Sequence, residues 1–442
     1  MTHKIKIKRG LNIPLDGAAI GMAEVIQPES VGITPDDFVG YTWKCAVKEG
    51  DSVAKGSPLL FDKLSGKIKI VSPIAGKVKE IRRGERRKIL AVVVTPEISE
   101  VNEPEFNTEL KSENIRETLQ AAGLWAMMRQ RPFDIVPEPE SDPRDIFITA
   151  FDSAPLSRHL FDNSQIELIE KGLEALTVLT GKKPYIATHE SHAHIFKNAE
   201  NIVMEGPHPA GNVGVQIAAV KPVNKGEVVW TMDIELVIRI GKLYLENSLE
   251  WETQVALTGP MMKSPRIVKT VIGIDISQLI ADIKEDPADL RFISGNVLTG
   301  YQVNPKKDFL RYPYRQITVI TEGADADEFM GWASLRPDKF STKRTFPAFL
   351  RGLSKPFPFD ARIKGGRRAM ILSGELDKVF PFDIYPEFLL RAIESGDIDK
   401  MEKLGIYEVA PEDFALPEFV DTSKQELQKI VREGLDNLRN EL

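Results

Sequence analysis

Cysteine is almost absent from this chain, and the single thiol, Cys45, excludes an internal disulfide and any all-cysteine zinc or iron–sulfur site. No run approaches the roughly 18 consecutive apolar residues that a membrane-spanning helix needs. Basic charge is not in excess either, because 58 Lys and Arg stand against 65 Asp and Glu, a net charge of −7. That balance argues against nucleic-acid binding as the main task. The N-terminal MTHKIKIKRG lacks the apolar core of a secretory signal, so we expect a soluble, cytosolic protein.

What is present is ordinary for folded protein, with 42% hydrophobic and 28% charged residues over 442 positions. That length suggests roughly three domains. We predict an α/β multidomain chain with domains at 1–100, 101–252, 253–325 and 326–442.

The first domain, 1–100, shows short alternating strands separated by glycine turns. Its spacing VxxGDxVxxGxxL, followed by SPxxGxV, resembles the barrel-sandwich fold of biotinyl and lipoyl carrier domains. In such a carrier Lys67 would hold the prosthetic group. The surrounding SGKIK is neither a biotin nor a lipoyl recognition sequence, so we interpret the domain as a structural module with Lys67 unmodified.

The second domain, 101–252, contains a predicted strand at 145–150, an amphipathic helix at 164–179 and a strand at 183–188. This order indicates a βαβ unit with parallel pairing, and we expect a Rossmann-like α/β domain. No GxGxxG motif follows the first strand and no GxxxxGK[ST] motif occurs in the sequence, so neither common nucleotide-binding motif is present.

The third domain, 253–325, has the order hairpin, helix, strand, with its helix expected near Ser277, and we predict a β-grasp domain of the soluble-ligand-binding type. The remainder, 326–442, is a basic, Pro-rich segment followed by a helical domain, with helices expected at 387–394 and 424–442.

Two groups of residues invite a functional interpretation. His189, His192 and His194 could chelate a metal, although three exposed histidines explain the same pattern. His208 lies in the loop GPHPAG, where prolines and glycines leave backbone N–H groups available for a ligand, or form a rigid connector.

Residues 335–368 carry 10 basic and 2 acidic side chains, which a docking face for anionic lipid or an acidic protein neighbour explains as well as a solvated loop does. Within this segment Arg344, Arg367 and Arg368 are our candidates for membrane or partner docking.

Several segments in order resemble one family, the A-type subunit of the sodium-translocating NADH:quinone reductase. The segments are 42–78, 123–133, 206–211, 259–268, 291–300 and 382–391. The resemblance implies a peripheral subunit, on the cytoplasmic side of the cell membrane, of a complex that oxidises NADH, reduces quinone and exports Na⁺. Its partners would be the other subunits and quinone, with flavins and iron–sulfur clusters held elsewhere in the complex.

More distantly, the chain is similar to the electron-input subunits of Rnf-type complexes and of respiratory complex I. Their glycine-rich flavin loop corresponds here to residues 123–133, where bulky Trp125, Met127 and Met128 would block the backbone approach to a phosphate. Their cluster cysteines correspond to positions without thiolates: Met370, Ser373, Leu376, Phe380, Pro411, Phe414, Pro417 and Asp421. We therefore expect a chain that binds no flavin, cluster or metal.

A quinone site needs an apolar cleft and one or two donors, and our candidates are His208, Gly206 and Gly211. Two alternatives remain open at this point. The chain could be a purely structural scaffold without a ligand, or an independent enzyme, using either a metal at His189, His192 and His194 or a carrier group at Lys67.

Overall fold

A six-stranded sheet forms the centre of the molecule. The computed structural model describes residues 2–98, 100–284, 289–323, 339–342, 347 and 355–441. The strand order is β1 (Thr2–Lys6), β13 (Glu200–Glu205), β12 (Tyr185–His189), β11 (Asp145–Thr149), β14 (Val229–Asp233) and β10 (Arg129–Arg131). All neighbours pair in parallel except β10, which runs antiparallel to β14. Consecutive apolar residues of the central strands, such as 146–148, are all buried, because helices cover the sheet on both faces.

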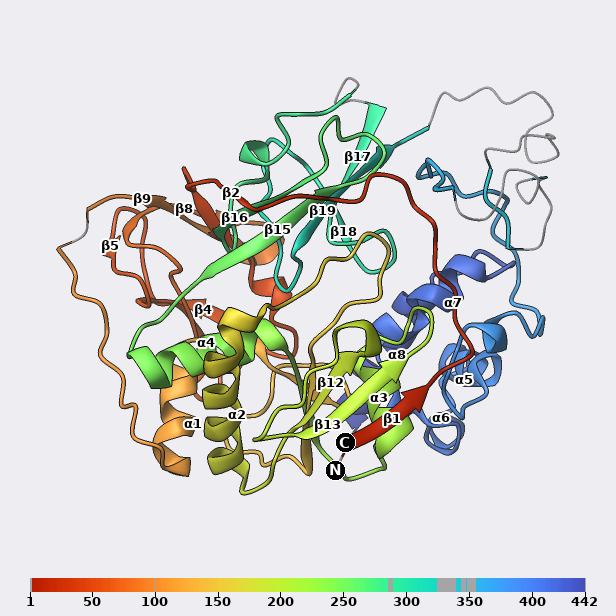
Figure 1. Ribbon diagram of the computed structural model, residues 1–442, viewed down its shortest axis with the longest axis horizontal. Helices are drawn as coiled ribbons and strands as arrows, with labels where there is room; N and C mark the ends of the chain where they lie inside the picture. Colours follow the sequence, from red (N-terminus) through yellow and green to blue (C-terminus); the bar gives the residue numbers. More distant parts are fainter. Residues whose placement is uncertain are drawn as a thin grey trace.

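Helices cover both faces of this sheet, as Figure 1 shows. One face packs against α1 (Ser112–Ala121), α2 (Ile166–Thr180) and α4 (Ile234–Glu246), the other against α3 (Val213–Val220) and the C-terminal helices. Helix α2 ends where Gly181 takes a left-handed conformation, φ 71°, and α4 begins where the Asp233 carboxylate accepts a bond from the Leu236 N–H at 3.0 Å. The predicted strand–helix–strand unit is thus present, within two residues at each boundary.

Two small antiparallel sheets lie near the N-terminus. One contains β3 (Val31–Ile33), β9 (Ile89–Pro96), β8 (Gly76–Arg83) and β5 (Ser52–Val53); the other contains β4 (Trp43–Cys45), β6 (Pro58–Asp62) and β7 (Lys69–Val71). Their inward side chains, among them Val31, Leu59 and Val92, share one core with α1 and α2. Strands β1 and β2 (Glu24–Val25) lie outside this pair, because the chain's first residues join the two larger sheets.

A second six-stranded sheet is mixed. Its order is β18 (Tyr301–Val303), β17 (Leu290–Ser294), β19 (Gln316–Thr321), β15 (Glu252–Thr258), β16 (Arg266–Val271) and β2. The hairpin β15–β16 forms as expected. The helix expected near Ser277 is wrong in extent, since only a three-residue 3₁₀ turn forms at Ile276–Gln278, capped by the Asp275 carboxylate. The apolar side chains there, Ile276 and Leu279, are buried beneath the sheet without a longer helix.

The C-terminal part is helical, with α5 (Pro386–Glu394), α6 (Ile398–Lys403), α7 (Ala415–Val420) and α8 (Leu427–Glu441). Both long predicted helices are present, and α8 buries Leu427, Val431, Leu435 and Leu438 on one face. Helix α8 packs on α5, and the group lies against the face of the central sheet that carries α3. Figure 1 shows it on the opposite side of that sheet from α2 and α4.

Candidate functional site

A cavity of about 760 Å³ opens at the carboxyl ends of β11 and β14. The chain leaves β11 through α2 toward β12 on one face, whereas α3 leads from β13 to β14 across the other. The carboxyl ends of parallel strands are the usual position of a ligand in such sheets. Its volume lies in the range typical of small-molecule sites. The cavity is therefore the candidate binding site of this chain.

Widely separated parts of the chain contribute walls to the cavity. Its lining residues fall in the ranges 36–39, 127–134, 149–160, 208–213, 231–233, 295–301, 312–316 and 411–433. The N-terminal part contributes the segment between β3 and β4, and the C-terminal part contributes residues of 411–433. A ligand there would contact segments that are hundreds of residues apart in the sequence.

His208 lines the cavity and is 4% exposed. Its Nδ1 lies 3.0 Å from Ser153 Oγ, and its backbone N–H donates to Asn12 Oδ1 at 2.8 Å. Burial lowers the pKa of His208 to about 4, although nearby Asp152 and a hydrogen bond with the Ser153 backbone act in the opposite direction. The imidazole is thus neutral at pH 7 and presents a hydrogen-bonding group in a water-poor wall.

The two candidate glycines have different surroundings. Gly211 lines the cavity, but its N–H donates to Ser153 Oγ at 2.8 Å and its carbonyl accepts from Thr149 Oγ1 at 3.0 Å. Gly206, at φ 134°, packs against Ile7 and is not among the lining residues. The loop's backbone donors that we expected to be available are largely engaged: Ala210 and Asn212 donate within the loop. Any ligand contact here falls to His208 and to the loop's shape.

A buried carboxylate, Asp37, also lines the cavity. It accepts from Arg311 Nε at 2.6 Å and from the Tyr312 N–H at 3.0 Å. Burial raises the pKa of Asp37 to about 6, although Arg311 opposes this shift. Tyr312 also donates its hydroxyl to the Met127 carbonyl at 2.7 Å. These contacts attach the N-terminal sheets to the mixed sheet at the edge of the cavity.

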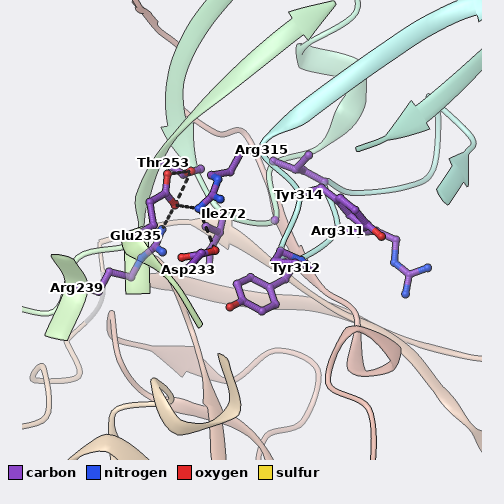
Figure 2. A pocket seen from close by; sticks show the side chains of 12 residues that line it. Asp233, Glu235, Arg239, Thr253, Ile272, Arg311, Tyr312, Tyr314 and Arg315 are labelled. Atoms are coloured by element: carbon purple, nitrogen blue, oxygen red, sulfur yellow. Dashed lines mark hydrogen bonds and ion pairs between the residues drawn. The ribbon is translucent and has the colours of Figure 1, made fainter. Parts of the chain in front are cut away.

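An ion-pair network lies where the central and mixed sheets meet, in a smaller pocket that Figure 2 shows. This pocket adjoins the cavity, because Asp233 and Arg315 line both. Arg315 Nη1 lies 3.0 Å from Asp233 Oδ2 and 3.4 Å from Glu235 Oε2. Glu235 also pairs with Arg239 at 3.2 Å and with Arg158 at 3.2 Å. Burial raises the pKa of Glu235, but these three arginines lower it by more, so the carboxylate is ionised. The network fixes the relative position of the two sheets.

The three clustered histidines do not converge on one point. His189 and His192 each contact Ser191, at 2.7 and 2.8 Å, whereas the His194 ring packs on Phe196 at 4.5 Å between centroids. In the described part of the chain, no group of three or more His, Cys, Asp or Glu is arranged to hold a metal ion. Nothing in this geometry favours a metal-dependent enzyme.

Large buried side chains fill several of the positions that we expect to correspond to redox sites. Trp125 is completely buried, and its ring lies 5.0 Å from that of Trp230. Phe380 and Phe414, one from each of the two stretches that we expect to correspond to cluster motifs, are also buried, and their ring centroids lie 4.9 Å apart. A flavin phosphate or a cluster would need the space that these rings fill, so the residues present do not fit either group.

The structure describes two of the three candidate docking residues. Arg344 lies outside the described residues, whereas Arg367 and Arg368 are exposed. Arg367 pairs with Glu426 at 2.9 Å, and further along the segment Asp360 pairs with Arg362 and Lys364. Lys67 is exposed and pairs with Glu140. Within the described residues, no helix has the length and apolarity required to cross a bilayer.

Sequence reasoning missed most of the cavity lining. Asp37, Arg129, Arg315 and Glu412 all contribute to it, yet each occurs in an unremarkable local sequence. One sequence signal could have identified some of these lining residues, namely a polar residue at the end of an apolar strand, such as Asp233 at the end of β14.

Comparison with known proteins supports the resemblance along the whole chain. Family models described as the NqrA N-terminal barrel-sandwich hybrid domain, the NqrA second alpha/beta domain and the NQRA C-terminal domain match residues 5–97, 110–249 and 254–304. The first two matches confirm a mixed α/β protein with an N-terminal barrel-sandwich domain. A hydrogenase chain, from an NAD⁺-reducing [NiFe] enzyme, aligns over 49% of this chain and 47% of its own at 10% identity with a TM-score of 0.33, too low to show a shared fold.

Full-length relatives share one name, that of the A-type subunit of the Na(+)-translocating NADH-quinone reductase. The protein from Neisseria gonorrhoeae (strain ATCC 700825 / FA 1090) is 36% identical over 457 residues, covering 99% of this chain and 100% of its own. Those from Pasteurella multocida and Vibrio atlanticus are 35% and 34% identical, with the same 99% and 100% coverage. The resemblance inferred from the sequence is thereby confirmed, and the chain belongs to the NqrA family, the A-type subunits of the Na(+)-translocating NADH-quinone reductase.

Proposed function

We propose that this chain is the peripheral, redox-cofactor-free subunit of a membrane complex that oxidises NADH, reduces quinone and exports Na⁺. The observation that carries the proposal is the 36% identity to an NqrA protein over 99% of this chain. The buried Trp125, Phe380 and Phe414 support the absence of a flavin or cluster from this chain. The other subunits would then carry the electrons, and this chain would lie on their cytoplasmic side.

The strand order β13-β12-β11-β14, with helices on both faces, supports a Rossmann-like middle domain at 101–252. The β15–β16 hairpin in a mixed sheet supports a β-grasp domain at 253–325. Both domains border the cavity, which makes their junction the functional centre of the proposal.

The proposal further holds that the cavity binds the quinone head group. A quinone is an apolar ring with two carbonyl acceptors, so it needs an apolar enclosure and a small number of donors. Phe151, Leu160 and Met232 supply apolar walls, and neutral His208 is the candidate donor. Gly211 and Gly206 would act indirectly, by allowing the tight course of the loop that carries His208.

A titration of the full chain with a short-chain ubiquinone tests this binding. We expect saturable binding at micromolar concentration. The affinity should be about tenfold weaker or worse in His208→Ala, because this variant loses at least one buried hydrogen bond to the quinone. His192→Ala, an exposed histidine outside the cavity, serves as the matched control and should bind as wild type does. Absence of saturable binding would favour the alternative of a scaffold without a ligand.

The role in the complex is tested separately, in membranes from a strain whose reductase lacks its NqrA protein. Addition of this chain should restore Na⁺-stimulated NADH:quinone reductase activity, and the chain alone should oxidise no NADH. Restoration by the buffer control, or activity of the chain alone, would contradict the proposed role.

A further inference from the structure

Residues 362–374 form an exposed stretch of unusual composition, Arg-Ile-Lys-Gly-Gly-Arg-Arg-Ala-Met-Ile-Leu-Ser-Gly. It contains four basic side chains and no acidic one. Three of its four large apolar residues are exposed, Ile363 by 59%, Ile371 by 55% and Leu372 by 49%, whereas Met370 packs against the C-terminal core. Single exposed apolar residues need no explanation, but several together beside cations do.

Two exposed aromatic side chains lie at the start of helix α5. The Ser373 N–H donates to Glu387 Oε1 at 2.9 Å, and Arg391 Nη2 donates to the Met370 carbonyl at 3.1 Å. These bonds hold residues 370–373 along the first turns of α5. Tyr385, which directly precedes α5, is 69% exposed and Phe388 in its first turn is 51% exposed, and their rings lie 6.1 Å apart. Residues 370–373 thus lie beside α5, and exposed side chains of this stretch and of residues 385–391 are together called the α5 face: Ile363, Arg367, Arg368, Ile371, Leu372, Tyr385, Phe388 and Arg391.

We infer that the α5 face docks directly on an anionic lipid surface. Aromatic and aliphatic side chains insert at the level of the lipid head groups, while neighbouring Lys and Arg meet their phosphates. The ion pair of Arg367 with Glu426 is exposed on both sides, at 57% and 49%, and exposed pairs contribute little. Lipid phosphate can therefore replace Glu426 at small cost.

The composition favours lipid over a protein partner. The stretch 362–374 carries four cations and no carboxylate beside its apolar side chains, so its own charge calls for an anionic surface. A sheet of anionic head groups is complementary to such a mixture at every position, because it offers negative charge and hydrocarbon side by side. This inference rests on the proposed membrane-complex function and extends it by naming the surface that meets the bilayer.

The test is flotation of the full chain with vesicles of phosphatidylcholine, with or without about 30% phosphatidylglycerol. We expect the chain to bind the anionic vesicles only. This binding should be lost at about 1 M salt, because the Debye length there is roughly 3 Å and attraction between charges farther apart is screened. The double variant Arg367→Glu/Arg368→Glu should bind at least about 25-fold more weakly, from about fivefold per basic residue. Leu372→Ser/Phe388→Ser should lose about tenfold or more through the apolar contact alone.

Ile20→Ser/Met22→Ser is the matched control, because these side chains are 78% and 96% exposed but lie on another part of the surface, near β2. This control should bind vesicles as wild type does. Equal loss in the control, or binding by wild type to neither vesicle, would overturn the inference. So would α5-face variants that bind vesicles normally but fail to join the detergent-solubilised complex, since the partner would then be a protein. Quinone titration of the same variants keeps this outcome separate from the proposed function.

Discussion

Replacement of Glu235 by Gln removes the centre of the ion-pair network between the two large sheets. The carboxylate pairs with Arg158, Arg239 and Arg315 at 3.2 to 3.4 Å and is 14% exposed. At an effective dielectric constant near 20, each pair at this separation amounts to about 5 kcal/mol before the cost of desolvation. Breaking a buried pair leaves cations uncompensated and costs about 3–5 kcal/mol. We expect Glu235→Gln to lower the free energy of unfolding by about 4 kcal/mol at pH 7.

Urea unfolding with linear extrapolation measures this change. The control is Glu250→Gln, which disrupts a more exposed pair with Lys242 at 3.3 Å and should cost less than about 1 kcal/mol. Because the folded-state pKa of Glu235 is lowered, its stabilisation is present above the ordinary pKa of 4.5 and is lost as pH falls through the folded value. Wild type and variant should therefore converge in stability at acidic pH. A cost of Glu235→Gln no larger than that of the control would refute this account of the network.

Three further outcomes are expected. His208 has a pKa of about 4 in the folded chain and 6.5 in the unfolded chain, so between these values only the unfolded chain gains a proton. As pH falls from 6.5 to 4, the free energy of unfolding measured in urea should therefore drop by up to about 3 kcal/mol more for wild type than for His208→Gln. Parallel pH profiles of the two proteins would contradict this. A Cβ on Gly241 would collide with the Leu168 carbonyl where α4 crosses α2, so Gly241→Ala should lower the free energy of unfolding by about 1–3 kcal/mol. The control Gly366→Ala has open space around it and should change that free energy by less than about 0.5 kcal/mol. Equal urea-unfolding midpoints of the two variants would refute the close packing. The purified full chain should show no flavin or iron absorbance and an intact mass without a group on Lys67; stoichiometric flavin, iron or added mass would contradict the filled sites.

Local patterns predicted the elements that local interactions determine. The apolar spacing of 164–179 identified α2, whose end is set by Gly181, and the stripe at 424–442 identified α8. The same reasoning overextended the helix at Ser277, because buried apolar side chains at helical spacing also suit an irregular segment beneath a sheet. Short apolar runs do not reveal which sheet they join, and β1 and β2 pair with strands about 200 residues away or more.

The candidate site was predicted in part. His208 drew attention because its loop is rich in proline and glycine, and it does line the cavity. The charged groups around it could not be found in this way, because their partners are distant in sequence. Arg131 is buried and bonds Asp413 at 2.7 Å across 282 positions, and Arg311 bonds Asp37 across 274. Only the assembled fold brings such residues together, and no local spacing records them.

Quinone binding in the cavity is most directly tested by filling it. Ala154 is 8% exposed and lines the cavity, so Ala154→Trp places an indole in the space proposed for the quinone ring. The control is Ala369→Trp at an exposed position outside the cavity. Isothermal titration of each full chain with a short-chain ubiquinone should give saturable micromolar binding for wild type and the control, and affinity about tenfold weaker or worse for Ala154→Trp. Equal affinities in all three, with the fold of Ala154→Trp verified by circular dichroism, would contradict a quinone site in this cavity.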